Sequence, residues 1–131
     1  MKRLLVFVLM VVLLTACGKS EPLFTDNGNP GHIKAVVFYD ENQNGIMDGG
    51  DTGAPSIRLA LADRVGCSSS TGSLNFVPTD SNGVVNFSDL KPGLYCVGVD
   101  NGYKTTTTLT MDAYVSSDAV TTVMFGIIKE P

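Results

Sequence analysis

Short runs of β-branched and aromatic residues, separated by turn residues, follow one another from residue 33 to the end of the chain. None of these runs is long enough, with apolar residues every three or four positions, to form an amphipathic helix. The pattern therefore predicts strands. We expect seven strands, at residues 33–39, 56–62, 74–78, 84–87, 95–99, 104–110 and 120–128. Seven short strands in about 100 residues predict an all-β fold, an antiparallel Greek-key β-sandwich.

Turn residues separate the predicted strands 74–78 and 84–87. They form the sequence Asp80-Ser81-Asn82-Gly83. Because Asn and Gly adopt positive φ at little steric cost, this sequence predicts a tight hairpin between the two strands.

The start of the chain has the pattern of an export signal. A positive Lys2-Arg3 pair precedes an unbroken apolar run at residues 4–14, and small residues follow that run. The apolar run is too short to span a bilayer. We therefore expect a cleaved secretory leader at residues 1–16 and an exported protein.

The sequence Leu14-Thr15-Ala16-Cys17 resembles the lipobox that lipoprotein signal peptidase cleaves. This resemblance implies a mature chain that begins at Cys17, whose thiol carries a diacylglycerol and whose amine carries a further acyl chain. Such an anchor makes the cell membrane or the outer membrane a partner, with the protein facing the periplasm or the cell exterior. Several acyl chains hold much more firmly than one, since each buried methylene contributes about 0.8 kcal/mol. The alternative is an ordinary secretory leader followed by an unrelated cysteine.

Removal of the leader makes the protein more acidic. The full chain has nine basic and thirteen acidic residues, and loss of Lys2 and Arg3 changes the net charge from −4 to −6. This charge argues against nucleic acid as a partner. Gly, Pro, Asn, Ser and charged residues dominate residues 18–31. We expect residues 17–31 to form a lipidated tether and residues 32–131 to form one monomeric domain.

Two cysteines, Cys67 and Cys96, remain once Cys17 carries lipid. An even pair in an oxidising compartment predicts one disulfide. Closure of a loop of about 30 residues would stabilise the fold by about 3 to 4 kcal/mol on the chain-entropy model. The alternative is two separate buried thiols, and the cysteine spacing does not indicate a zinc site.

The clearest chemical motif is the loop between the first two predicted strands, residues 40–51, with the sequence DENQNGIMDGGD. Oxygen side chains at positions 1, 3, 5, 9 and 12 and glycine at position 6 match the calcium loop of an EF-hand. A hard dication takes six to eight oxygen ligands at about 2.4 Å, and this spacing brings alternate side chains to one point. The predicted Ca²⁺ ligands are the side chains of Asp40, Asn42, Asn44, Asp48 and Asp51 and the carbonyl oxygen of Ile46.

Two features of this loop predict weak binding. Position 12 is Asp51, which is one methylene shorter than Glu, and positions 3 and 5 are neutral Asn. Extracellular calcium modules work with Kd values of roughly 10⁻⁴ to 10⁻³ M, so a weak site would still fill outside the cell. The alternative is a loop that caps itself through Asx-turns and binds no metal.

Both halves of the chain resemble one family of surface domains. The residues that carry the resemblance are Val37-Phe38-Tyr39-Asp40-Glu41-Asn42-Gln43-Asn44-Gly45, Asp48, Gly50-Asp51, Gly53, Thr79-Asp80-Ser81-Asn82-Gly83, Phe87, Leu90, Pro92-Gly93, Tyr95 and Val97. They are similar to the B domains of serine-aspartate-repeat adhesins (SdrD B-like domains) and to collagen-adhesin B-type domains, over residues 33 to 99. The resemblance implies a calcium-binding, prealbumin-like (transthyretin-like) sandwich that serves as a stalk, spacer or accessory module.

The sequence does not favour an enzyme. His32 is the only histidine, and the chain has no G-x-S-x-G nucleophile elbow. We expect a non-enzymatic, lipid-anchored cell-envelope protein whose calcium-stabilised sandwich has a structural, spacer or adhesive role. The alternative is an extracytoplasmic binding protein for a glycan, a peptide or a partner lipoprotein.

Overall fold

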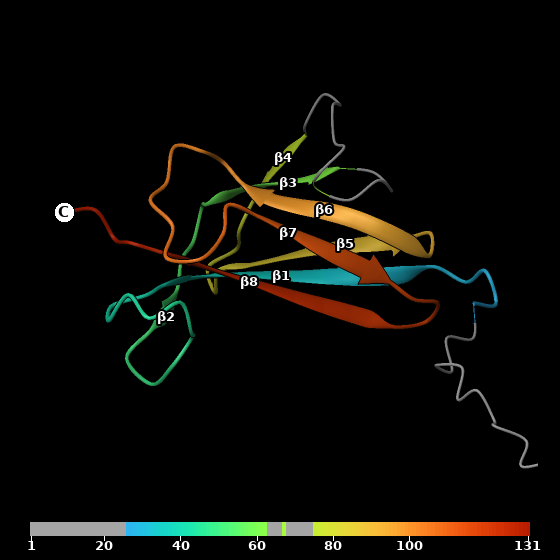
Figure 1. Ribbon diagram of the computed structural model, residues 1–131, viewed down its shortest axis with the longest axis horizontal. Coiled ribbons are helices and arrows are strands. Elements are labelled where there is room, and N and C mark those ends of the chain that lie inside the picture. The colour runs from blue at the N-terminus through green and yellow to red at the C-terminus, as the bar shows by residue number, and fades with distance from the viewer. Residues whose placement is uncertain (1–25, 63–66, 68–74) are drawn as a thin grey trace, which may run out of the picture.

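The computed structural model describes residues 26–62, 67 and 75–131. The predicted leader, the predicted lipidation residue Cys17 and the first part of the predicted tether lie outside these residues. The described residues form eight strands in two sheets that pack face to face (Figure 1). They contain no helix that is long and apolar enough to cross a membrane. The predicted all-β sandwich is confirmed.

Each sheet contains four strands. The first contains β1 (Gly31–Tyr39), β2 (Thr52–Gly53), β5 (Val84–Leu90) and β8 (Val120–Ile127). In this sheet β1 pairs with all three other strands. The second sheet contains β3 (Arg58–Ala62), β4 (Phe76–Pro78), β6 (Gly93–Val99) and β7 (Thr110–Val115), in the order β4-β3-β6-β7.

One strand pair departs from the antiparallel prediction. β1 and β8 run parallel over eight residue pairs, from His32 opposite Val120 to Tyr39 opposite Ile127. A two-residue hairpin forces its strands to be antiparallel, whereas strands joined by a long crossover have no such restraint. The first and last strands are linked through the whole domain, so their direction could not be read from a turn.

The predicted strand 104–110 is wrong. Strand β7 begins only at Thr110, and residues 104–108, which we call the threonine strap, lie along the outer edge of β8. The backbone N–H of Thr106 donates to the carbonyl of Gly126 at 2.9 Å, and the N–H of Ile128 donates to the carbonyl of Lys104 at 2.9 Å. Threonine favours extended backbone, but here the chain bends at Thr106 and Thr107, and only Thr105 forms an isolated bridge, with Ile127 at the end of β8.

The turn at residues 80–83 is present, but it does not form the predicted hairpin. The N–H of Gly83 donates to the carbonyl of Asp80 at 3.0 Å, and Gly83 has a φ of 77°. The flanking strands β4 and β5 belong to different sheets, so the turn carries the chain across the sandwich. A Cβ at Gly83 would overlap backbone atoms of Val37 and Ala54. Only glycine lets this turn pack against β1.

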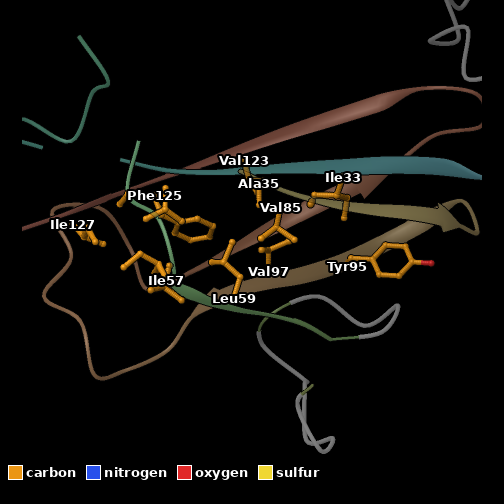
Figure 2. Close-up of a cluster of buried hydrophobic side chains, with 14 of the residues drawn as sticks. Ile33, Ala35, Ile57, Leu59, Val85, Tyr95, Val97, Val123, Phe125 and Ile127 are labelled. Atoms are coloured by element: carbon orange, nitrogen blue, oxygen red, sulfur yellow. The ribbon is translucent and has the colours of Figure 1, made fainter. Parts of the chain in front are cut away.

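Apolar side chains from both sheets fill the space between them (Figure 2). The largest fully buried side chains of this core are Phe125, Ile33, Leu59, Ile127, Val37, Val97 and Val115. Tyr95 also lies in the core, and its hydroxyl donates to the carbonyl of Lys91 at 2.9 Å. The phenol can therefore be buried without leaving its polar end unpaired.

Cys67 and Cys96 form the predicted disulfide, with their Cα atoms 4.7 Å apart. Cys96 lies in β6 and is buried. The N–H of Cys67 also donates to the carboxylate of Asp112 in β7 at 2.6 Å. One covalent bond and one hydrogen bond thus attach Cys67 to neighbouring strands of the second sheet.

Residues just before β1 contact the turn between β7 and β8. The side-chain amides of Asn27 and Asn29 donate to Oδ2 of Asp118, and the hydroxyl of Ser117 donates to Oδ1 of Asp26. We call these five residues the N-terminal clamp. The sequence analysis placed Asp26, Asn27 and Asn29 in the tether, but these three residues contact the domain.

Candidate functional site

The oxygen-rich loop, residues 40–51, connects the end of β1 to the start of β2. Figure 1 shows this loop, in teal and green, at the end of the sandwich opposite the N-terminal clamp. The loop therefore faces away from the point where the chain enters the domain.

Asp40 forms the centre of the first half of the loop. It is only 2% exposed, and its Oδ1 and Oδ2 accept hydrogen bonds from the backbone N–H groups of Asn44 at 3.1 Å and Gly45 at 2.7 Å. Gly45 has a φ of 76°, as the glycine position of a calcium loop requires. The backbone thus bends tightly around one buried carboxylate.

The charge of Asp40 is stabilised by its neighbours. Burial raises the pKa of this carboxyl, but the Thr106 hydroxyl and the backbone amides of Gly45, Asn44 and Gln43 lower it, so the pKa lies below its usual value. Asp40 is therefore an anion at neutral pH. A buried anion held by dipoles alone is a favourable ligand for a cation.

Asp48 joins the two asparagines of the loop. Its Oδ2 accepts hydrogen bonds from Nδ2 of Asn42 and from Nδ2 of Asn44, both at 2.9 Å. These two amides lower the pKa of the Asp48 carboxyl. Three of the predicted ligands, Asn42, Asn44 and Asp48, therefore meet at one point.

Asp51 closes the loop. Its Oδ1 accepts from the N–H of Glu41 at 3.0 Å, and its Oδ2 accepts from the N–H of Asp48 at 2.9 Å. The last residue of the loop is thus tied to the second and the ninth. This closure brings the start of β2 back to the end of β1.

The loop suits calcium in its chemistry. Its side chains offer only oxygen donors in the predicted ligand positions, which is the donor type that Ca²⁺ takes. In the described conformation each carboxylate pairs with N–H groups, and no group of three or more His, Cys, Asp or Glu side chains in the described ranges is arranged to hold a metal. The N–H of Ile46 donates to Oδ1 of Asn44 at 2.8 Å. Ion binding would require Asn42 and Asn44 to present oxygen in place of Nδ2–H.

A groove of about 270 Å³ lies beside the end of β1. Its lining includes the buried side chains of Ile57 and Ile127, the half-buried rings of Tyr39 and Tyr103, and the exposed residues Lys104, Lys129 and Glu130. The ammonium of Lys129 lies 5.4 Å from the centroid of the Tyr39 ring. This groove could not be located from the sequence, because its two tyrosines come from the end of a strand and from a distant loop.

The two-sheet sandwich, whose first strand leads into an oxygen-rich loop, can be compared with known families. The model of the SdrD B-like domain family matches residues 31–128. The chain belongs to the SdrD B-like domain family.

Two solved structures share the fold. A minor pilin of Streptococcus agalactiae has a TM-score of 0.55 and 17% identity, over 79% of this chain and 46% of that chain. A streptococcal ancillary pilin has a TM-score of 0.55 and 19% identity, over 78% of this chain and 33% of that chain. At these identities the similarity concerns the fold alone.

A relative by sequence is Colossin-B of Dictyostelium discoideum. It is 35% identical over 72 residues, which are 53% of this chain and 2% of Colossin-B. The chain therefore corresponds to a small part of that protein and to less than half of each pilin.

Proposed function

We propose that this protein is a non-enzymatic, lipid-anchored module of the cell envelope, with a structural, spacer or adhesive role. The observation that carries the proposal is the arrangement of the domain along its long axis. The N-terminal clamp lies at one end, while the oxygen-rich loop and the groove adjoin the opposite end of β1 (Figure 1). A domain attached by its N-terminal side would present the loop and the groove away from the membrane.

The family supports a surface role. The chain belongs to the SdrD B-like family, and proteins with the same fold include a minor and an ancillary pilin. Pilins are surface structures, which supports a structural role outside the cell for this module. Export of this chain and its attachment through Cys17 follow from the lipobox-like sequence at residues 14–17.

Calcium is the proposed cofactor of this module. Asp40, Asn42, Asn44, Asp48 and Asp51 would supply side-chain oxygens, and Ile46 would supply its carbonyl oxygen. A bound dication supplies positive charge that links the end of β1 to the start of β2. The backbone N–H groups of Asn44 and Gly45 would orient the Asp40 carboxylate for the ion.

Lipid attachment can be tested directly in an exporting bacterial host. The full chain should incorporate a palmitate analogue and fractionate with membranes, whereas Cys17→Ala should do neither, because the thioether needs the sulfur at the cleavage site. The double variant Cys67→Ala, Cys96→Ala is the matched control, and it should label like the wild type. Equal labelling of Cys17→Ala and wild type would show that lipid is not attached at Cys17.

The groove favours a second candidate function, the binding of an extracytoplasmic ligand. Two tyrosine rings line this groove, and its two lysines outnumber its one glutamate, which suits an anionic glycan or peptide. A screen of immobilised acidic glycans and acidic peptides should give binding that Tyr103→Ala removes and that Tyr114→Ala, a tyrosine on the exposed face of β7, leaves unchanged. Binding that survives Tyr103→Ala would exclude the groove.

A further inference from the structure

Thr106 of the threonine strap reaches the first residue of the oxygen-rich loop. Both its hydroxyl oxygen and Oδ2 of Asp40 lie within 3.2 Å of the point that a Cβ on Gly126 of β8 would occupy. The hydroxyl oxygen is itself buried and has no hydrogen bond of normal geometry within the described part of the chain. The strap and the loop are distant in sequence, so this contact exists only in the folded domain.

Gly126 of β8 makes the contact possible. A Cβ at this position would overlap the Thr106 hydroxyl oxygen, and it would lie 3.2 Å from Oδ2 of Asp40 and 3.0 Å from Cζ of Phe38. A glycine inside a strand often marks the close approach of another segment. Here it allows the strap to lie directly on β8 beside the Asp40 carboxylate.

The strap also borders the loop at Gly45. A Cβ on Gly45 would lie 3.4 Å from the carbonyl oxygen of Thr106. The N–H of Gly45 donates to Oδ2 of Asp40, the oxygen that faces Gly126 and the strap. Thr106 and Gly45 therefore both lie beside the Asp40 carboxylate.

The strap is held on β8 by few bonds. Thr106 and Ile128 supply the two backbone hydrogen bonds named above, and the N–H of Gly126 donates to the hydroxyl of Thr107 at 3.3 Å. A segment held by so few bonds opens at low free energy compared with the central strands. An ion that fixes the Asp40 carboxylate would therefore act on the strap through Thr106.

We propose that Thr106 is a positioning residue for the ion site, and that calcium binding at residues 40–51 is coupled to docking of the threonine strap on the edge of β8. This inference rests on the calcium site proposed above. A bound ion fixes the Asp40 carboxylate, and the Thr106 hydroxyl then donates to it, so that the buried hydroxyl gains its partner. By linkage, the docked strap strengthens calcium binding by the same factor by which calcium favours docking.

The test uses the mature lipoprotein in detergent micelles. Calorimetry measures its calcium affinity, and hydrogen exchange with mass spectrometry measures protection of the amides of Thr106 and Ile128, in EDTA and in calcium. Calcium should slow exchange at these amides several-fold. Thr106→Val should weaken calcium binding about tenfold, the low end for loss of a group that orients a ligand, and should remove the calcium effect on exchange.

Two further variants separate positioning from general damage. Thr106→Ser keeps the hydroxyl and should restore both affinity and coupling. Thr108→Val removes an exposed hydroxyl of the same strap and should behave like the wild type.

The outcomes distinguish this inference from the proposed function. Calcium binding with unchanged exchange in the strap would overturn the coupling and leave the calcium module intact. Absence of calcium binding to the wild type would overturn both. The exchange measurement on the wild type decides the coupling even if Thr106→Val does not fold.

Discussion

Asn29 donates its side-chain amide to Oδ2 of Asp118 at 2.9 Å, across 89 positions of the sequence. Asn27 donates to the same oxygen at 3.0 Å. Asp118 lies in the turn between β7 and β8 with a φ of 55°, a conformation that Asp and Asn tolerate better than most residues. The clamp therefore depends on a short acidic side chain at one strained turn position.

We expect Asp118→Ala to release the segment before β1. The variant loses both accepted hydrogen bonds and places a less tolerant residue at positive φ, so limited proteolysis within residues 26–30 should become several-fold faster and the melting temperature should fall by a few degrees. Asp118→Asn keeps one acceptor oxygen and tolerates the turn, so it should give an intermediate result. Unchanged cleavage in Asp118→Ala would contradict the clamp.

The clamp should also depend on pH. The Asn27 and Asn29 amides hold the pKa of Asp118 below its usual value of 3.8. Because the folded-state pKa is the lower one, the stabilisation is complete above the unfolded value and is lost as the pH falls through the folded value. Between pH 5 and pH 2 the melting temperature of the wild type should fall more than that of Asp118→Asn, which cannot titrate at this position. Parallel curves would exclude Asp118 as a contributor.

Thr79 should be important for stability, because it joins β4 to the segment before β3. It is 5% exposed, and its hydroxyl donates to the carbonyl of Ala54 at 2.6 Å and accepts from the N–H of Ile57 at 3.0 Å. Thr79→Val leaves both buried groups unpaired, which should reduce the free energy of unfolding by about 1 to 3 kcal/mol. Urea denaturation measures this loss, and Thr79→Ser should recover most of it.

The disulfide should contribute substantially to stability. Its cysteines are separated by 29 positions, and the double variant Cys67→Ser, Cys96→Ser should lose about 3 to 4 kcal/mol of unfolding free energy on the chain-entropy model. Mass spectrometry of a tryptic digest should show one linked peptide pair that disappears on reduction. Quantitative alkylation of the unreduced protein would contradict the bond.

Calcium should raise the melting temperature. An ion that binds only the folded state at ten times its Kd adds about 1.4 kcal/mol, which for a domain of this size is a shift of several degrees. Asp40→Ala together with Asp51→Ala should abolish the shift, whereas Glu41→Gln, which changes a loop carboxylate outside the ligand positions, should retain it. Equal melting temperatures in EDTA and in about 10 mM calcium would contradict calcium binding and would favour the alternative of a loop that only caps itself.

The strands were predictable where alternation and β-branched residues agree. β1, β5, β6 and β8 lie close to their predicted ranges. β2 has two residues, too few to produce a pattern, and β7 was displaced because the neighbouring threonines have the higher strand propensity. The parallel pairing of β1 with β8 depends on the whole fold, and no local sequence determines it.

The candidate site, too, has one part that local sequence indicates and another that only the fold brings together. The predicted ligands lie within twelve consecutive residues, so their spacing alone indicates the loop. Thr106 and Tyr103 reach the loop and the groove from another part of the chain, and only tertiary structure brings them there. Gly126 was the available signal, since an isolated glycine in a strand of larger residues indicates a close approach.

The parallel pairing of β1 with β8 has a mechanical consequence. Tension between the start of β1 and the end of β8 acts along both strands, in opposite directions. Such a load shears the whole ladder, so its hydrogen bonds resist together, whereas a hairpin pulled at its open end separates one bond at a time. A domain held by a membrane anchor before Gly31 and pulled beyond Ile127 would therefore bear force through its longest strand pair.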